Sequence, residues 1–257
     1  MDFVLRYAQQ KEQFRKAELE SLLQSGGIKV QELKEPSISS PFHKIRLPSI
    51  DEAKYLSESS VLLIDVYQLF CSAESLEELR DMCRRFVDFT EYADVPFRFR
   101  VDSFMKTFTD SEQLEMINSF SFMPLKGPVK LKDPSAVCFT IMFDGLKQEW
   151  MFGVQVSVDM KMRKQVEIYN LKKRDYLGTT SMEAEMGLLM ANIGLVKQNH
   201  LVYDPFVGTG SLLFAASHFG AFSFGSDIDG RQMRGGREDP NGRGSLHSNT
   251  RQYRLEG

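Results

Sequence analysis

The sequence is poor in cysteine, tryptophan and histidine, which excludes several kinds of functional site. It has three cysteines, one tryptophan and four histidines among 257 residues. Cys71, Cys83 and Cys138 are far apart and form no C-x-x-C pair, so neither a disulfide framework nor a zinc site is indicated. Buried thiols are typical of a reducing compartment, and the sequence therefore predicts an intracellular, cytoplasmic protein.

Long apolar runs and a large excess of one charge are also missing. No apolar run approaches the roughly 18 residues of a membrane-spanning helix, and Asp2 and Arg6 break the pattern of a signal peptide. The net charge is −3, so the whole-chain balance does not indicate a nucleic-acid-binding protein, although a local basic surface is compatible with it. A share of 42% apolar residues, with 20 phenylalanines, excludes a wholly disordered chain.

Short strands and helices in mixed order fill the first two-thirds of the chain, which predicts an α+β region. The expected strands cover residues 3–7, 28–33, 42–47, 61–70, 97–101, 136–143 and 150–158. Capping boxes mark three expected helix starts, at Ser49–Glu52, Ser75–Glu78 and Thr109–Glu112. We divide this region near residue 60, into units of residues 1–60 and 61–159.

Apolar periodicity predicts which side chains of this region are buried. The second of the capped helices has a stripe that includes Leu79, Cys83 and Phe86, so these residues are expected in a core. The strand at residues 97–101 alternates strictly between apolar and basic residues. Its phenylalanines are therefore expected to face the core, with Arg98 and Arg100 facing water or a ligand.

A basic stretch follows at residues 160–174. It contains six lysines and arginines and a single acidic residue, Glu167. A solvated linker between domains is one interpretation. A surface that contacts phosphates is the other, because neutralised phosphates supply most of the affinity for nucleic acids.

A regular alternation of helix and strand begins near residue 180. A capping box at Thr180–Glu183 predicts a helix that ends near Gly194. The strand expected at residues 200–203 leads into the loop D-P-F-V-G-T-G at 204–210, then a helix at 211–218 and a second strand at 221–225. This order predicts half of a nucleotide-binding β–α–β fold.

The loop and the strand ends carry the chemistry of this half. Gly208 and Gly210 permit tight backbone geometry and close approach of a ligand to the helix start. Asp227 follows the second strand, 19 residues beyond Gly208, where an acid can accept hydrogen bonds from both ribose hydroxyls. The third glycine of a dinucleotide fingerprint and the Gly-Lys-Ser/Thr of a P-loop are both missing. Asp204, before the loop, repels phosphates and suits a cationic ligand, which favours S-adenosylmethionine.

Two segments resemble a known family. L-K-K-R-D-Y-L-G-T-T-S-M-E at residues 171–183 and D-P-F-V-G-T-G at 204–210 are similar to the catalytic subunit of the eukaryotic tRNA (guanine-10) N2-methyltransferases. The stretch N-T-R-Q-Y at 249–253 extends the resemblance, and the upstream match is looser but in the same order.

The resemblance implies a ferredoxin-like region and a THUMP RNA-binding domain, followed by a Rossmann-type methyltransferase domain that begins at residue 175. It implies methyl transfer from S-adenosylmethionine to the 2-amino group of guanine 10 in tRNA, with a small zinc-binding activator subunit as partner. The implied cofactor-binding residues are Thr180, Ser181, Asp204, Phe206, Gly208, Gly210 and Asp227, with Asp229 as a less favoured alternative to Asp227.

One motif of such enzymes is missing. Amino-methyltransferases of this class carry an Asp/Asn-Pro-Pro-Tyr/Phe motif that orients the target amine and stacks on the extruded base. No Pro-Pro pair occurs in the 257 residues, so no catalytic residue is assigned. We expect residues 175–257 to be an incomplete methyltransferase domain that is inactive alone, and the polar, arginine-rich segment 229–257 to be a mobile surface segment.

Two other functions agree with the same residues. A tRNA-binding module without catalysis would keep the N-terminal region and lose the chemistry. A DNA amino-methyltransferase would share the glycine loop, but it gives no reason for the α+β region.

Overall fold

Two units make up the chain in the computed structural model, which describes residues 1–30, 35–156, 161–175, 177, 181–228 and 246–255. The first unit consists of residues 1–16, 26–58 and 63–160. The second consists of residues 17–25, 59–62 and 161–257. The backbone therefore passes between the units several times, and short N-terminal segments belong to the second unit.

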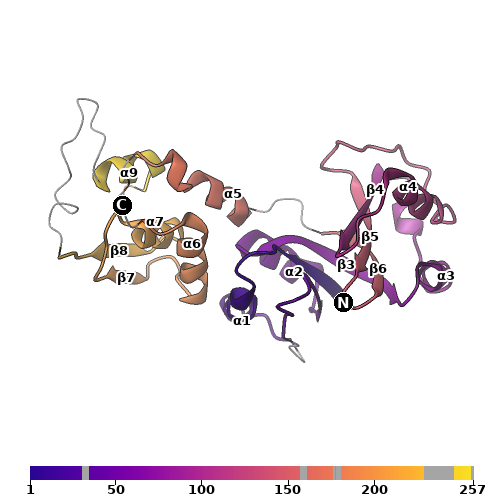
Figure 1. Ribbon diagram of the computed structural model, residues 1–257, viewed down its shortest axis with the longest axis horizontal. Coiled ribbons are helices and arrows are strands. Elements are labelled where there is room, and N and C mark those ends of the chain that lie inside the picture. The colour runs from indigo at the N-terminus through magenta and orange to yellow at the C-terminus, as the bar shows by residue number, and fades with distance from the viewer. Residues whose placement is uncertain (31–34, 157–160, 176, 178–180, 229–245, 256–257) are drawn as a thin grey trace. The chain divides into compact units, whose positions relative to one another are not determined.

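A six-stranded sheet forms the centre of the first unit (Figure 1). Its strands are β1 (Asp2–Tyr7), β2 (Phe42–Arg46), β3 (Leu63–Ala73), β4 (Phe97–Phe104), β5 (Val137–Asp144) and β6 (Glu149–Gln155). The spatial order is β2-β1-β3-β6-β5-β4, and only the pair β4–β5 is parallel. The α+β character predicted for this region is confirmed.

The helices of the first unit begin at the predicted caps. They are α2 (Ile50–Ser59), α3 (Leu76–Phe86) and α4 (Asp110–Asn118), with 3₁₀ turns η1 (Glu12–Phe14) and η2 (Thr90–Tyr92). The Ser75 side chain accepts a hydrogen bond from the Glu78 amide. Thr109 and Glu112 form the complete reciprocal box at the start of α4. These side chains satisfy amide groups that have no partner inside the helix.

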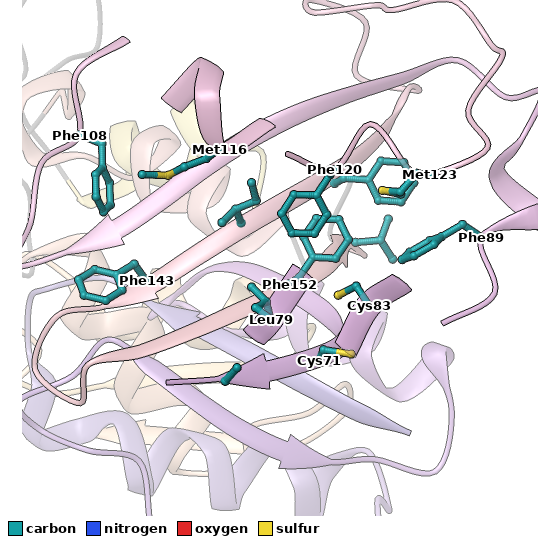
Figure 2. Close-up of a cluster of buried hydrophobic side chains, with 14 residues drawn as sticks. Cys71, Leu79, Cys83, Phe89, Phe108, Met116, Phe120, Met123, Phe143 and Phe152 are labelled. Carbon is teal, nitrogen blue, oxygen red and sulfur yellow. The ribbon is translucent and has the colours of Figure 1, made fainter. Parts of the chain in front are cut away.

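An aromatic core lies between the sheet and the helices α3 and α4 (Figure 2). The Phe120 and Phe152 rings stack with their centroids 4.3 Å apart. Leu79 and Cys83 of α3 are fully buried here, as predicted. Phe86, the last residue of α3, is 76% exposed, so its expected burial is wrong; Phe89, three residues further along, is buried in this core instead.

The opposite face of this sheet carries a polar network. The Arg100 guanidinium donates to the Asp65 carboxylate at 2.8 Å and also contacts the Tyr67 hydroxyl. Arg6 of β1 pairs with Asp102 of β4 at 3.0 Å, although three strands separate β1 from β4 in the sheet order. The sheet must therefore curl toward this face. Arg100 points away from the phenylalanine core, as the alternation predicts, but its charge is paired within the protein.

Two expectations for the N-terminal region need comment. Residues 28–30 are not a strand, and residues 31–34 of the same prediction lie outside the described part. The predicted boundary near residue 60 falls between α2 and β3. Because β1 and β2 belong to the same sheet as β3–β6, the strands on both sides of that boundary share one hydrogen-bond ladder.

The second unit contains a small parallel α/β element. Strands β7 (Leu201–Asp204) and β8 (Phe222–Gly225) pair in parallel, and α7 (Ser211–His218) connects them. The other described helices of this unit include α5 (Lys161–Ile168), α6 (Ala184–Ile193) and α9 (Leu246–Tyr253), with η3 at Leu171–Lys173. Gly187 of α6 fits closely against Ala215 of α7, where an added Cβ would approach the Ala215 Cβ to 3.3 Å. The predicted β–α–β half is confirmed.

Helix α9 corrects the expectation of a mobile tail. Residues 246–253 are helical, and Ser248 and Asn249 are buried at 4% and 0% exposure. Composition predicted a solvated segment because its apolar residues are few, but α9 docks mainly through polar and aromatic side chains. Residues 229–245, which include Asp229, lie outside the described part.

The N-terminal helix α1 (Arg15–Ser25) joins the second unit through a buried carboxylate. Glu18 is 1% exposed, and it accepts hydrogen bonds from the amides of Val61 and Leu62 at 2.7 and 3.1 Å. The Asn192 side chain of α6 donates to the same carboxylate at 3.0 Å. Burial raises the pKa of Glu18, although the hydrogen bonds oppose this effect. The junction ties two N-terminal segments to the α6 helix.

In the part of the chain that the structure describes, no helix is long and apolar enough to cross a membrane.

Candidate functional site

The glycine loop between β7 and α7 turns sharply at two residues. Gly208 and Gly210 have φ angles of 49° and 81°, in the left-handed region that favours glycine. Gly210 is the N-cap residue of α7, and none of the described side chains caps this helix. The first amide groups of α7 therefore have no side-chain acceptor, an arrangement that suits a ligand with hydrogen-bond acceptors.

Two carboxylates flank this loop at the carboxyl ends of the parallel strands. Asp204 ends β7, and its Oδ1 accepts a hydrogen bond from the Phe206 amide at 2.9 Å. Asp227 follows β8, and its Oδ2 accepts from the Gly208 amide at 2.8 Å. The predicted ribose-binding acid is thus tied directly to the predicted glycine loop. An added Cβ at Gly225 would lie 2.6 Å from the Asp204 carbonyl, so close strand contact requires glycine there.

The remaining predicted site residues have different surroundings. The Ser181 hydroxyl lies 2.9 Å from the Thr209 hydroxyl, so the segment before α6 touches the glycine loop. The Phe206 ring is 84% exposed. Thr180 lies outside the described residues. Helix α6 begins at Ala184 with Glu183 as its N-cap residue, so the start expected from the Thr180 capping box is too early.

Arg174 is a residue of this site that sequence reasoning did not single out. It is only 6% exposed, and its Nη1 donates to the Ser211 hydroxyl at 2.6 Å, at the first residue of α7. Its Nε donates to the Tyr253 hydroxyl at 3.1 Å. The guanidinium also lies over the rings of Phe214 and Tyr253, 5.3 and 5.8 Å from their centroids. Burial removes this cation from water at the edge of the glycine loop.

Helix α9 holds the segment around Arg174 in place. The Gln252 side-chain carbonyl accepts a hydrogen bond from the Asp175 amide at 3.0 Å, and its amide group donates to the Lys173 carbonyl. One side chain therefore binds backbone groups on both sides of Arg174. The only signal in the sequence was the family-like stretch N-T-R-Q-Y, which includes Gln252 and Tyr253.

Several basic residues of the predicted linker make contacts inside the second unit. Arg163 of α5 donates to the Val61 carbonyl at 2.9 Å and lies 3.8 Å from the Glu185 carboxylate. Lys173 pairs with Glu167 at 2.7 Å. With Arg174 buried as well, part of the basic stretch has a structural role, and its contact with phosphates stays a prediction.

The first unit has a basic loop beside a small cavity. Lys126, Lys130 and Lys132 are exposed on the loop between α4 and β5. A cavity of about 290 Å³ lies next to this loop, and its lining includes Arg98 and Gln155. The Arg98 Nη1 and the carbonyl of Leu131 are 3.5 Å apart, which brings the loop close to the cavity. Arg98 brings a positive charge to the lining of this cavity, and the exposed lysines of the loop are suited to contact with an anionic ligand.

The donor set fits S-adenosylmethionine. The cofactor has a ribose that needs a hydrogen-bond acceptor, a cationic sulfonium and ammonium, and a carboxylate. Asp227 supplies an acceptor at the end of β8, and Asp204 a negative charge at the end of β7. The start of α7 lies between Asp204 and Asp227 in the sequence, and its first amide groups can donate hydrogen bonds to the carboxylate of the cofactor.

Solved structures define the class of this fold. The chain resembles TrmN from Thermus thermophilus with a TM-score of 0.56 and 17% sequence identity, over 91% of this chain and 68% of that one. A possible methylase from Clostridium difficile 630 matches with a TM-score of 0.50 and 11% identity, over 85% and 55% of the two chains. The fold is therefore an α+β N-terminal region followed by a Rossmann-type α/β fold as in methyltransferases.

Sequence relatives then give the family. The family model described as the Tmrp11 THUMP N-terminal domain matches residues 1–166, and the chain belongs to this family. It is 34% identical over 275 residues to the tRNA (guanine(10)-N(2))-methyltransferase TRMT11 of Homo sapiens, which covers 99% of this chain and 58% of that protein. The Saccharomyces cerevisiae tRNA (guanine(10)-N(2))-methyltransferase is 35% identical over 236 residues, or 86% of this chain and 54% of that protein. The chain thus spans little more than half the length of these relatives.

Proposed function

We propose that this chain supplies the tRNA-recognition region and cofactor-binding residues of a tRNA (guanine-10) N2-methyltransferase. The observation that carries the proposal is the contact between Asp227 and Gly208, because it unites the ribose-binding acid with the glycine loop. The names of the relatives support the reaction and the substrate. S-adenosylmethionine would supply an electrophilic methyl group to the guanine amine.

In this proposal each site residue has a defined task. Asp227 accepts hydrogen bonds from the ribose, and Gly208 and Gly210 allow the backbone to approach the cofactor closely. Asp204 favours the positive charges of the methionine portion through Coulomb attraction. Ser181, which contacts Thr209, and Thr180 line the methionine end. Phe206 lies in the same loop, and its exposed ring is available to a ligand.

Cofactor binding by the full 257-residue chain tests the first half of the proposal. S-adenosylhomocysteine, the reaction product, is titrated calorimetrically against the chain and an Asp227→Asn variant. We expect binding that the substitution weakens by roughly 10-fold, because a hydrogen bond to a charged acceptor contributes about 1.5 kcal/mol. Asp133→Asn, a change at an acid in the first unit, is the matched control and should bind as the unmodified chain does.

The tRNA half of the proposal is tested separately, by filter binding across a salt series. Removing the charges of Lys130 and Lys132 by alanine substitution should weaken tRNA binding and flatten its salt dependence, since each phosphate contact adds about one to the slope. Duplex DNA should compete poorly. Better competition by duplex DNA than by tRNA would favour a DNA amino-methyltransferase.

The two assays also separate the second candidate function. A chain that binds tRNA but not S-adenosylhomocysteine would be a tRNA-binding module without catalysis. The continuous sheet and basic loop of the first unit favour this candidate as the alternative, because they do not depend on the cofactor half. Failure to bind either ligand would contradict both candidates.

We also propose a cytoplasmic location and a small zinc-binding activator subunit as a partner. The three cysteines are free and buried, which supports a reducing compartment. The activator subunit rests on the resemblance alone. Co-purification of the chain with such a subunit tests it, and separate elution of the two proteins would contradict it.

A further inference from the structure

A buried positive charge at the start of α7 lacks an anionic partner. Arg174 is 6% exposed, and its hydrogen bonds go to the hydroxyl groups of Ser211 and Tyr253. In the part of the chain that the structure describes, no carboxylate forms an ion pair with it, and its Nη2 has no hydrogen-bond partner. Buried charges in proteins are normally paired, because desolvation of an isolated ion is strongly unfavourable.

The position of this cation makes the imbalance larger. Ser211 is the first residue of α7, and the N-terminus of a helix carries a partial positive charge. Two positive groups therefore meet at the same place, and no side chain among the residues that the structure describes caps the helix to offset them. The aromatic rings of Phe214 and Tyr253 give only partial compensation through cation–π contact. An anion bound here would remove the imbalance.

We propose that Arg174 and the uncapped start of α7 bind the carboxylate of the methionine portion of S-adenosylmethionine. This inference rests on the proposed function, which brings the cofactor to the glycine loop. Guanidinium groups match carboxylates with two parallel hydrogen bonds, and the unpartnered Nη2 is available for one of them. Asp227 would hold the ribose at the other end of the ligand, so the two residues fix its direction.

Helix α9 has a defined role in this arrangement. Tyr253 holds the Nε of Arg174, and Gln252 binds the backbone on both sides of it. The rigid shell keeps the guanidinium at Ser211 before a ligand binds, which lowers the entropy lost on binding. Tyr253 is therefore a positioning residue, whereas Arg174 touches the ligand.

A comparison of two ligands on two proteins tests the pairing directly. S-adenosylhomocysteine and its decarboxylated analogue are titrated calorimetrically against the full chain and against an Arg174→Met variant. The unmodified chain should bind the decarboxylated analogue roughly 10- to 100-fold more weakly, as expected for the loss of hydrogen bonds between charged groups. In Arg174→Met the preference for S-adenosylhomocysteine over the decarboxylated analogue should fall to about 3-fold or less, because the cation that binds the carboxylate has been removed.

Two further variants separate ligand contact from structural damage. Tyr253→Phe removes the hydroxyl and keeps both the ring and the Arg174 charge, so the preference for the carboxylate should persist. If Arg174→Met melts below the assay temperature, Arg174→Gln takes its place and should give the same loss of preference. Thermal unfolding of each variant, followed by circular dichroism, shows which of them are folded.

The outcomes distinguish this inference from the proposed function. If the unmodified chain does not bind S-adenosylhomocysteine, the proposed function itself fails. If it binds both ligands equally, or if a folded Arg174 variant keeps the full preference, the cofactor site stands and the role of Arg174 is overturned.

Discussion

The sheets of the two units contain similar apolar residues but bury them very differently. Phe139 and Ile141 of β5 are both 0% exposed. Phe222 and Phe224 of β8 are 61% and 48% exposed. The first sheet has helices and aromatic side chains on one face and a second apolar cluster on the other.

The smaller sheet has one covered face in the part of the chain that is described. The Ser223 hydroxyl lies 2.7 Å from the Ser217 hydroxyl of α7, so this side of β8 faces the helix. Phe222 and Phe224 must point to the opposite face, since side chains alternate along a strand. There the rings of Phe224 and Tyr203 lie 5.0 Å apart. This difference shows that the apolar side chains of a strand are buried only where another layer covers them. Four predictions compare the buried groups of the two units with this exposed face.

The largest effect is expected in the aromatic core of the first unit. Phe152→Ala should lower the free energy of unfolding by about 4 kcal/mol, because it removes a fully buried ring and leaves a cavity. Urea unfolding followed by tryptophan fluorescence measures this unit specifically. Trp150, the single tryptophan, lies 4.5 Å from the Phe143 ring in the same core. A loss below 1 kcal/mol would contradict a tightly packed core.

The second prediction concerns the buried carboxylate of the second unit. Glu18→Ala should lower the free energy of unfolding by about 3 kcal/mol, because the amides of Val61 and Leu62 lose their acceptor while they remain buried. Hydrogen exchange of the α6 amides and the melt by circular dichroism report the loss. Glu20→Ala, at an exposed position of the same helix, is the control and should change stability by about 0.5 kcal/mol or less.

The third prediction is a pH dependence of the first unit. Burial, and secondly the nearby charge of Lys147, lower the pKa of His43 from 6.5 to about 4. Because the unfolded chain binds the proton more tightly, stability is complete above pH 6.5 and falls as the pH drops toward 4. The loss at about pH 5 should be roughly 2 kcal/mol.

A variant without the buried imidazole isolates that contribution. His43→Leu should remove this part of the acid sensitivity, measured as urea unfolding at several pH values. His200→Gln is the control, since His200 is exposed, and it should keep the acid sensitivity of the unmodified chain. Equal pH dependence in all three proteins would show that His43 does not titrate in this window.

The smallest effect is expected on the exposed face of β7 and β8. Phe222→Ser should change the free energy of unfolding by about 0.5 kcal/mol or less, because most of the Phe222 side chain is already exposed to solvent in the folded protein. The same change should reduce binding of an apolar fluorescent dye. A destabilisation as large as that of Phe152→Ala would mean that this face is covered.

Local signals in the sequence predicted much of the fold. The capping residues Ser75 and Thr109 and the left-handed glycines Gly208 and Gly210 act through neighbours only a few residues away. The helix at residues 211–218 was predicted with its observed ends, because Gly210 precedes it and Gly220 follows it closely. The contact of Asp227 with the glycine loop agreed with the spacing of a nucleotide-binding half.

Other features were missed because their partners are distant in the sequence. Composition treated residues 246–253 as a solvated tail, and periodicity placed Phe86 in the core. Neither rule contains the contacts that decide burial. Arg174 was counted within a basic linker, although its partners Ser211 and Tyr253 are 37 and 79 residues away.

The amino-acid order therefore determined the helix starts, the glycine turns and the placement of acids at strand ends, since each is a matter of local backbone geometry. The tertiary structure alone decided that Glu18 joins α6 and that the Arg174 guanidinium is buried against Ser211 and Tyr253. These two features depend on which distant groups satisfy a buried charge. The pattern of residue types along the chain does not predict these partners, because groups that folding brings together have no fixed spacing in the sequence.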